Sequence, residues 1–219
     1  MMMRTRELQK HARRRAILDA ARALILEDKA RDFSMPELAE KAGVSLVTPY
    51  NLFGSKSHIL LEVVREDIFE PVQAIGELTC DSLGDWIAEL SATLARIYYR
   101  NRHFYRRMIV TLVAQENAEV QRESLSLNYS LFETVLSRLA AQKKIAAAVS
   151  VSTLAKHVVH GVSGALQERL MERGSEQALR DEIEMSLLLV LDGIACPVDR
   201  AQIVQRIESL DKTRTAAAL

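Results

Sequence analysis

Side chains that could bind a charged partner lie close together in one short stretch of the chain. They are the hydroxyl, amide and ammonium groups of Ser45, Thr48, Tyr50, Asn51 and Lys56. All of these groups can donate hydrogen bonds to phosphate oxygens, and hydroxyls and amides can also bond to the edges of bases. The combination predicts contacts with a nucleic acid.

Two short helices joined by a glycine turn are expected to position these side chains. The first helix has apolar residues at helical spacing, namely Met35, Leu38, Ala39 and Ala42. Ser34 can cap its start, and Gly43 can end it because glycine enters the left-handed conformation without steric cost. Ser45 can then cap the second helix. This order of elements is typical of a helix-turn-helix, whose second helix enters the DNA major groove.

At this point the chain resembles the TetR family of one-component transcriptional regulators. The residues that carry the resemblance are Ala39, Gly43, Val44, Ser45, Thr48, Tyr50, Phe53, Ser55 and Lys56. The resemblance is close over residues 17–60 and beyond them is a match of helix number and length. It implies an all-α fold, in which an N-terminal three-helix helix-turn-helix domain is followed by a helical ligand-binding and dimerisation domain. The DNA-binding residues it implies are Ser34, Ser45, Leu46, Val47, Thr48, Tyr50, Asn51 and Lys56.

The second helix departs from the family pattern at Pro49, where the family usually has an aliphatic residue. Proline has no N–H and clashes with the carbonyl four residues earlier, here that of Ser45. One interpretation is a late or loosened helix start, capped near Val47 or Thr48. The other is that the proline turns Val47 and Thr48 towards the base edges.

The charges of the chain are unevenly distributed, although the formal net charge is zero. Residues 1–60 carry 11 Lys and Arg against 7 Asp and Glu, and the remainder carries 18 against 22. A basic first part fits a nucleic-acid-binding domain joined to a domain of another function. The basic residues of the N-terminal arm are Arg4, Arg6, Lys10, Arg13, Arg14 and Arg15. The arm is either a solvated terminus or a segment that lies along DNA phosphates.

Composition limits the remaining classes of protein. A chain of 219 residues with 48% hydrophobic residues, 8 Gly and 4 Pro favours a helical globular protein. Cys80 and Cys196 have no metal-like spacing and predict reduced thiols in a cytoplasmic protein. We find no apolar run long enough to span a membrane and no secretory signal. His157 and His160 lack further ligands, and no phosphate loop or catalytic set is visible, so we expect no metal, no cofactor and no enzyme.

The predicted boundary separates a DNA-binding domain with its basic arm, residues 1–56, from an effector-binding and dimerisation domain, residues 57–219. Ser55 and Ser57 are both candidate caps for a long helix that begins near Lys56. Pro71 should kink or break this helix around Phe69. The break would be either a plain helix end or a hinge between the two domains, and a kinked connecting helix is the interpretation we favour.

The second domain holds most of the aromatic residues. An ordinary core is one interpretation, and an apolar ligand pocket is the other. The predicted pocket residues are Trp86, Tyr98, Phe104, Tyr105, Met108, Tyr129 and Phe132. The resemblance implies a four-helix dimer interface, for which the candidates are His157, Gly161, Gly164, Ala165, Leu187, Leu188 and Leu191. Packing of these residues within one subunit is the alternative.

The resemblance implies a homodimeric regulator that binds a palindromic operator in double-stranded DNA. It would be a repressor that a small, largely apolar effector releases from DNA. A DNA-binding regulator or architectural factor without a small-molecule ligand is the second hypothesis. A helical enzyme is the third and has the least support, because no catalytic constellation is present.

Overall fold

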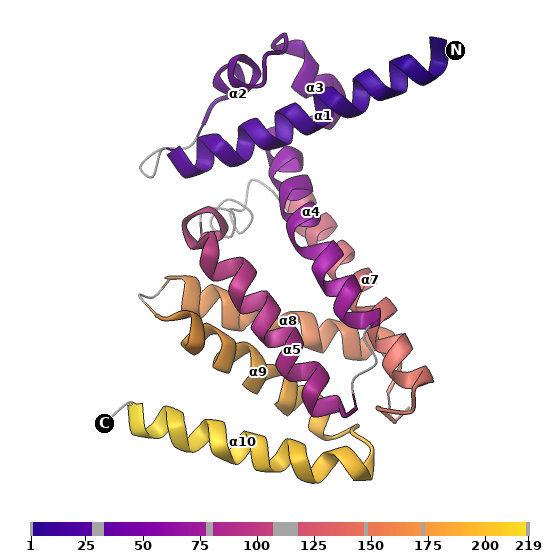
Figure 1. The fold of residues 1–219 in the computed structure, drawn as a ribbon, viewed down its shortest axis with the longest axis vertical. Helices are drawn as coiled ribbons and strands as arrows, with labels where there is room; N and C mark the ends of the chain where they lie inside the picture. Colours follow the sequence, from indigo (N-terminus) through magenta and orange to yellow (C-terminus); the bar gives the residue numbers. More distant parts are fainter. Residues whose placement is uncertain are drawn as a thin grey trace. The chain divides into compact units, whose positions relative to one another are not determined.

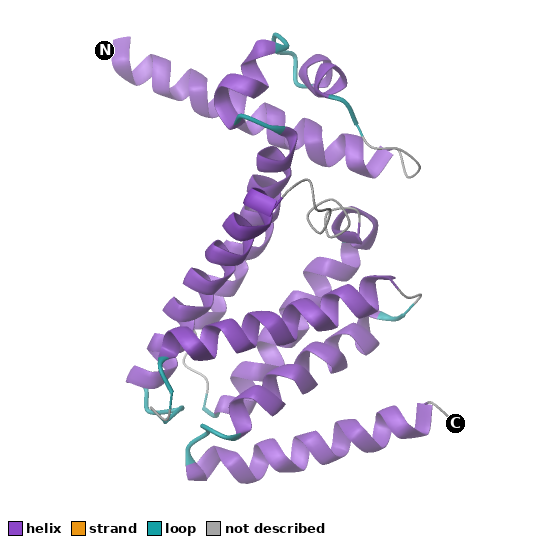
Figure 2. Ribbon diagram, turned by 180° about the vertical axis from the view of Figure 1, so that it is seen from behind, coloured by secondary structure: helices purple, strands orange, loops and turns teal. Residues whose placement is uncertain are grey.

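The computed structural model describes residues 2–27, 33–77, 81–106, 118–146, 149–171 and 174–217 (Figure 1). Within these ranges the regular structure is helical, and an isolated β-bridge between Ile145 and Ala195 is the only pairing of extended residues (Figure 2). The helices are α1 (Met2–Glu27), α2 (Met35–Lys41), α3 (Val47–Phe53), α4 (Lys56–Glu77), α5 (Leu83–Arg100), α7 (Ala118–Ala141), α8 (Val151–Met171), α9 (Glu176–Asp192) and α10 (Pro197–Ala217). Residues 102–106 form a further helical turn. The predicted all-α fold is confirmed.

The helices form two compact units. The first contains Met1–Asp67 and His103–Arg122, and the second contains Ile68–Arg102 and Glu123–Leu219. The domain boundary predicted between residues 56 and 57 separates two expected functions, whereas these two units are defined by packing. That boundary therefore stays a prediction.

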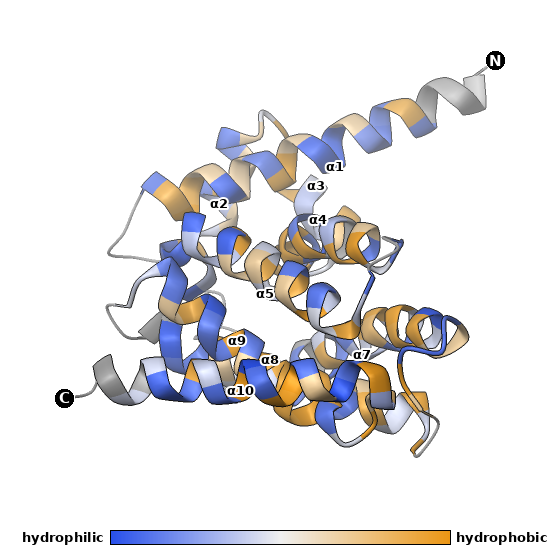
Figure 3. Cartoon of the chain, turned by 60° about the horizontal axis from the view of Figure 1, so that its bottom comes forward, coloured by the Kyte–Doolittle hydropathy of each residue, from blue (hydrophilic) through white to orange (hydrophobic). Residues whose placement is uncertain are grey.

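The core of the first unit joins α1 to the two short helices. Ile17 and Ala21 of α1 are fully buried, as is Leu38 of α2, and Phe33 is buried just before α2. Hydrophobic and hydrophilic residues alternate along α1 in Figure 3, as expected of a helix that buries one side. Burial of each large apolar side chain contributes about 1.5–3 kcal/mol. This small core fixes the position of the helix-turn-helix on α1.

The core of the second unit lies among α5, α8 and α9, and α10 packs on α9. Buried side chains on α5 recur at helical spacing and include Leu83, Ile87, Leu90 and Leu94. The carboxylate of Glu184 on α9 is also buried, where it accepts bonds of 2.7 and 3.0 Å from Arg206 of α10. These bonds attach the last helix to the core.

Helix α4 does not end at Pro71. It runs from Lys56 to Glu77 with the proline inside it, so the interpretation of a helix end around Phe69 is wrong. Ser55 caps its start, because the Ser55 hydroxyl accepts a bond of 3.2 Å from the backbone N–H of His58. Pro71 has no N–H, so the helical hydrogen bond to the carbonyl of Asp67, four residues earlier, is absent. Asp67 is the last residue of the segment Met1–Asp67 in the first unit.

Among the described residues, no helix combines the length and the apolar character that crossing a membrane requires.

Candidate nucleic-acid interface

The turn between α2 and α3 has the geometry of a Schellman motif. Gly43 has a φ of +65°, in the left-handed region that glycine tolerates best. Its N–H donates to the Glu40 carbonyl at 3.0 Å, and the Val44 N–H donates to the Ala39 carbonyl at 3.0 Å. The predicted role of Gly43 in ending α2 is therefore confirmed.

Ser34 caps the start of α2, as predicted. Its hydroxyl accepts from the Glu37 N–H at 3.4 Å and donates to the Glu37 carboxylate at 2.8 Å, while the Ser34 N–H donates to the same carboxylate at 2.7 Å. These reciprocal bonds form a capping box. Ser34 is exposed, and its contact with DNA stays a prediction.

One side of α3 faces solvent. Leu46, Val47 and Tyr50, which are close together in the chain, are 47%, 60% and 47% exposed, and neighbouring exposed apolar side chains are typical of an interaction surface. Ser45 and Asn51 are exposed beside them, and Thr48 is half-buried. We call Ser45, Leu46, Val47, Thr48, Tyr50 and Asn51 the recognition surface. All six residues belong to the predicted DNA-binding set, and the structure brings them together.

The opposite side of α3 faces the interior of the first unit. Pro49 is buried, and Leu52 and Phe53 are half-buried at the following helical positions. The predicted capping role of Ser45 is wrong, because Leu46 is the N-cap residue and no side chain caps this helix. The Ser45 and Thr48 hydroxyls instead bond to each other at 2.8 Å.

The late start of α3 explains why proline is tolerated at position 49. Since α3 begins at Val47, Pro49 is its third residue, and the first residues of a helix have N–H groups without a helical acceptor. Ser45 lies outside the helix, so no helical bond is broken. Of the two interpretations, the late helix start agrees with the structure, although the cap is Leu46 and not Val47 or Thr48. Pro49 serves as an inward-facing apolar residue.

Arg14 holds α3 against α1. Its Nη1 donates to the Leu52 carbonyl at 2.9 Å, and its guanidinium lies 4.3 Å from the centre of the Phe53 ring. Its Nη2 also lies 3.7 Å from the Glu62 carboxylate on α4. The sequence placed Arg14 in a basic arm, but these contacts make it a positioning residue for the recognition surface. A tertiary contact of this kind leaves no signal in the local sequence.

Lys56 also has a partner within the protein. Its Nζ donates to the Phe33 carbonyl at 2.5 Å and lies 4.4 Å from the centre of the Phe33 ring. The side chain is half-buried, and it joins the start of α4 to the segment before α2. The predicted contact between Lys56 and a phosphate stays a prediction.

The remaining basic residues of α1 differ in their surroundings. Arg15 forms ion pairs with Asp19 at 3.2 Å and with Glu66 at 3.6 Å. Lys10 and Arg13 are exposed and form no ion pair with any described residue. The side chains of Arg4 and Arg6 lie outside the described part. Lys10 and Arg13 are therefore the described cations of α1 best placed to meet a phosphate.

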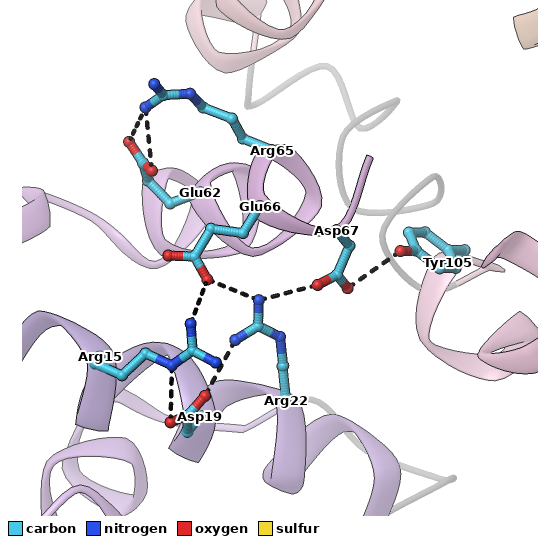
Figure 4. Close-up of polar contacts among 8 residues, drawn as sticks. All are labelled: Arg15, Asp19, Arg22, Glu62, Arg65, Glu66, Asp67 and Tyr105. Carbon is cyan, nitrogen blue, oxygen red and sulfur yellow. Dashed lines mark hydrogen bonds and ion pairs between the residues drawn. The ribbon is translucent and has the colours of Figure 1, made fainter. Parts of the chain in front are cut away.

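A cluster of charges joins α1 to α4 (Figure 4). Arg22 Nη2 donates to Glu66 and Asp67 at 2.9 Å each, and Nη1 donates to Asp19 at 3.1 Å. Burial would lower the pKa of Arg22, but the bonds and charges of Glu66 and Asp67 outweigh it and raise the pKa. The buried Tyr105 hydroxyl donates to the other oxygen of Asp67 at 3.1 Å. Asp67 thus connects the helical turn at 102–106 to both helices.

The predicted ligand-pocket residues divide between the two units. Phe104 and Tyr105 belong to the first unit, where their rings meet edge to face at 5.0 Å. Trp86, Tyr98, Tyr129 and Phe132 belong to the second, and Met108 lies outside the described residues.

Two aromatic residues of α5 carry polar groups, and Trp86 is buried whereas Tyr98 is half-buried. Trp86 is buried, and its indole N–H has no acceptor among the described residues. Burial raises the pKa of the Tyr98 phenol, which therefore stays neutral. The Tyr129 hydroxyl, by contrast, bonds to His160 Nε2 at 2.9 Å near the surface.

The predicted dimer residues fall into two groups. Ala165, Leu187, Leu188 and Leu191 are buried within this chain, so they belong to its own core and not to an interface surface. For these four residues the alternative of packing within one subunit agrees with the structure, because helical spacing cannot distinguish two apolar neighbours. His157 and Gly164 are exposed and Gly161 is half-buried, so these three stay candidates for a dimer contact.

Residues 17–63 match the family model of bacterial regulatory proteins, tetR family. The chain is similar to the crystal structure of a TetR transcriptional regulator from Rhodococcus sp. RHA1, with 22% identity and a TM-score of 0.67 over 84% of this chain and 97% of that one. It is similar to FadR of Thermus thermophilus, a TetR family transcriptional repressor in complex with lauroyl-CoA, with 19% identity and a TM-score of 0.70 over 82% and 94%.

It is also similar to RolR in complex with resorcinol, with 13% identity and a TM-score of 0.66 over 92% of this chain and 95% of that one. No curated protein matches the chain. At these identities the structural likeness establishes the fold, in which an N-terminal helix-turn-helix precedes a helical domain.

Proposed function

We propose that the chain is a member of the tetR family of bacterial regulatory proteins and a sequence-specific DNA-binding transcriptional regulator. The observation that carries the proposal is the exposed recognition surface on α3. Leu46, Val47 and Tyr50 lie close together on it with exposed fractions of 47%, 60% and 47%, and a group of exposed apolar side chains is typical of an interaction surface. A surface helix with such side chains fits the major groove of a duplex.

In this proposal the residues of the first unit have different roles in DNA binding. Residues 46–48 and Asn51 meet base edges, while Tyr50, Lys56, Lys10 and Arg13 meet phosphates. Arg14 and the glycine turn keep the recognition surface in place. Residues 1–56 act as the DNA-binding domain, and residues 57–219 bind the effector and form the homodimer.

A homodimer would present two recognition surfaces to a palindromic operator, whose half-sites lie about one or two helical turns apart. An effector would reduce operator binding only as far as it prefers the conformation that does not fit DNA. We propose a repressor released by a small, largely apolar effector. Support comes from the similar structures that carry lauroyl-CoA and resorcinol.

The bonds of Asp67 offer a route for this release. Tyr105 lies in the helical turn at 102–106, and its hydroxyl bonds to the same carboxylate that binds Arg22 of α1. A displacement of residues 102–106 would therefore disturb the contact between α1 and α4. The alternative function is a DNA-binding regulator without a small-molecule ligand.

The test begins with selection of bound duplexes from a random pool by the full-length protein. We expect a palindromic consensus, and failure to retain any duplex at low salt contradicts the proposal. Thr48→Ala should change the preference among the selected duplexes, whereas an equal loss on every sequence contradicts base contact by Thr48. Release of the selected duplex is then measured with lauroyl-CoA and resorcinol as the first probes in a wider screen. A screen in which no compound releases DNA favours the alternative.

A further inference from the structure

The recognition surface has an unusual composition for a protein that reads DNA. The segment from Ser45 to Phe53, SLVTPYNLF, contains no charged side chain. Its exposed members include the aliphatic side chains of Leu46 and Val47, which are 47% and 60% exposed. Arginine or lysine bound to guanine is the commonest specific contact in the major groove, and this surface cannot make it.

The polar groups of the surface are partly occupied. The Ser45 and Thr48 hydroxyls bond to each other at 2.8 Å, which uses one of the donors that these residues could offer to a base. Pro49 faces inward, so it offers nothing to DNA. The exposed amide of Asn51 remains as the side chain best suited to a bidentate contact, for which adenine is the usual base.

An apolar side chain finds one apolar partner in the major groove. This partner is the C5-methyl group of thymine, because the other groups at the base edges are hydrogen-bond donors and acceptors. We infer that Leu46 and Val47 select the operator by contact with thymine methyl groups. The inference rests on the proposed function and names the chemistry of the operator that this surface recognises.

The charge distribution of the first unit agrees with a neutral recognition surface. The exposed cations Lys10 and Arg13 lie on α1, outside the recognition surface, and can supply attraction to phosphates. Phosphate contacts position a protein on DNA without carrying sequence information. Specificity then depends on the base contacts of the recognition surface, which are those of Leu46, Val47, Thr48 and Asn51.

The experiment compares thymine with uracil in the duplex that the full-length protein selects. Uracil keeps the O4 acceptor and the base pairing of thymine and lacks only the methyl group. Each deoxyuridine replaces one thymidine, and the dissociation constant is measured by fluorescence anisotropy. At one or two thymines in each half-site we expect binding to weaken about fourfold, which corresponds to the removal of one buried methyl group.

A variant then assigns the methyl contact to a residue. For Val47→Ala, the ratio of the dissociation constants of the uracil and thymine duplexes should fall to about one at the position that Val47 contacts. Val47→Thr, which keeps one methyl group on a side chain of the same shape, should retain part of the ratio. Lys10→Met is the matched control. Removal of a cation that contacts a phosphate should weaken binding of both duplexes equally and leave the ratio of their dissociation constants unchanged.

The outcomes separate this inference from the proposed function. If no duplex is selected, the proposed function fails. If duplexes are selected but uracil binds as well as thymine at every position, the thymine-reading inference is overturned while DNA binding stands. A selected consensus whose half-sites contain only G·C pairs at the contacted positions would overturn it in the same way. Circular dichroism of Val47→Ala checks that the exposed substitution leaves the helices intact.

Discussion

Replacement of Arg14 by methionine distinguishes a positioning residue from a phosphate contact. The variant keeps a long apolar side chain but removes the bond from Nη1 to the Leu52 carbonyl at 2.9 Å. It also removes the interaction of the guanidinium with the Phe53 ring at 4.3 Å. Both interactions stabilise the attachment of α3 to α1, so the first effect should be on stability.

The magnitude follows from the contacts. A hydrogen bond from a charged group contributes about 1.5–3 kcal/mol, and the lower end applies because the Arg14 side chain is 30% exposed. The interaction with the Phe53 ring adds about 0.5–1 kcal/mol. The pair with Glu62 at 3.7 Å is partly solvated and adds little. We expect Arg14→Met to lower the free energy of unfolding by about 2 kcal/mol.

The assay combines urea unfolding with the salt dependence of DNA binding, at one protein concentration because dimerisation affects stability. Arg14→Met should lower stability and leave the slope of log K against log salt unchanged. The matched control is Arg13→Met, which removes an exposed cation from the same helix. It should reduce the magnitude of the slope by about 0.9 for each phosphate that the protein no longer neutralises. Its stability should stay within about 0.5 kcal/mol of the parent protein.

The reverse pattern would refute the reasoning. If Arg14→Met reduces the magnitude of the salt slope and leaves unfolding unchanged, the guanidinium binds a phosphate and its contacts with Leu52 and Phe53 contribute nothing. Equal behaviour of the two variants would show that the arm acts as one solvated cationic segment.

Three further substitutions test other parts of the chain. A Cβ at Gly164 would lie within 4 Å of no atom in the described part of the chain. If Gly164 packs against a partner helix, Gly164→Ala should weaken dimerisation in sedimentation equilibrium, and a more stable chain with unchanged association contradicts that interface. Arg206→Leu should lower the free energy of unfolding in urea by about 3 kcal/mol, because the buried Glu184 carboxylate loses its two bonds from Arg206. Adding Glu184→Leu should restore most of the lost stability. Tyr105→Phe should cost about 1.5 kcal/mol because it removes the bond to Asp67, and an unchanged unfolding midpoint would show that this bond is not significant.

The local features of the helix-turn-helix could be predicted from the sequence because their causes are local. The capping box of Ser34 depends on a carboxylate three residues later, and the end of α2 depends on the conformational freedom of Gly43. The start of α3 was less predictable, since a serine and a proline gave two possible first turns. Burial of Pro49 decides between them, and burial depends on tertiary packing.

Contacts between distant residues could not be predicted from the sequence. Arg14 and Leu52 are 38 positions apart, so nothing near Arg14 distinguishes it from the exposed Arg13. Helical periodicity likewise identified Leu187, Leu188 and Leu191 as apolar positions of one helix. It could not show that their neighbours belong to the same chain, and the structure places all three in the core.

Helix α4 shows how side-chain bonds can divide an element that the backbone leaves continuous. Its first part is bound to α1 through Arg22, which contacts Glu66 and Asp67 at 2.9 Å each. Its last turns pack in the second unit, where Gly76 approaches Val135 of α7 so closely that a Cβ would lie 2.8 Å from a methyl carbon. Between these parts Pro71 has no N–H to donate to the Asp67 carbonyl, so the helix lacks one backbone bond at Asp67. The Asp67 carboxylate is instead fixed by its bonds to Arg22 and Tyr105. We therefore expect an effector that acts through α4 to change the energy of these side-chain bonds.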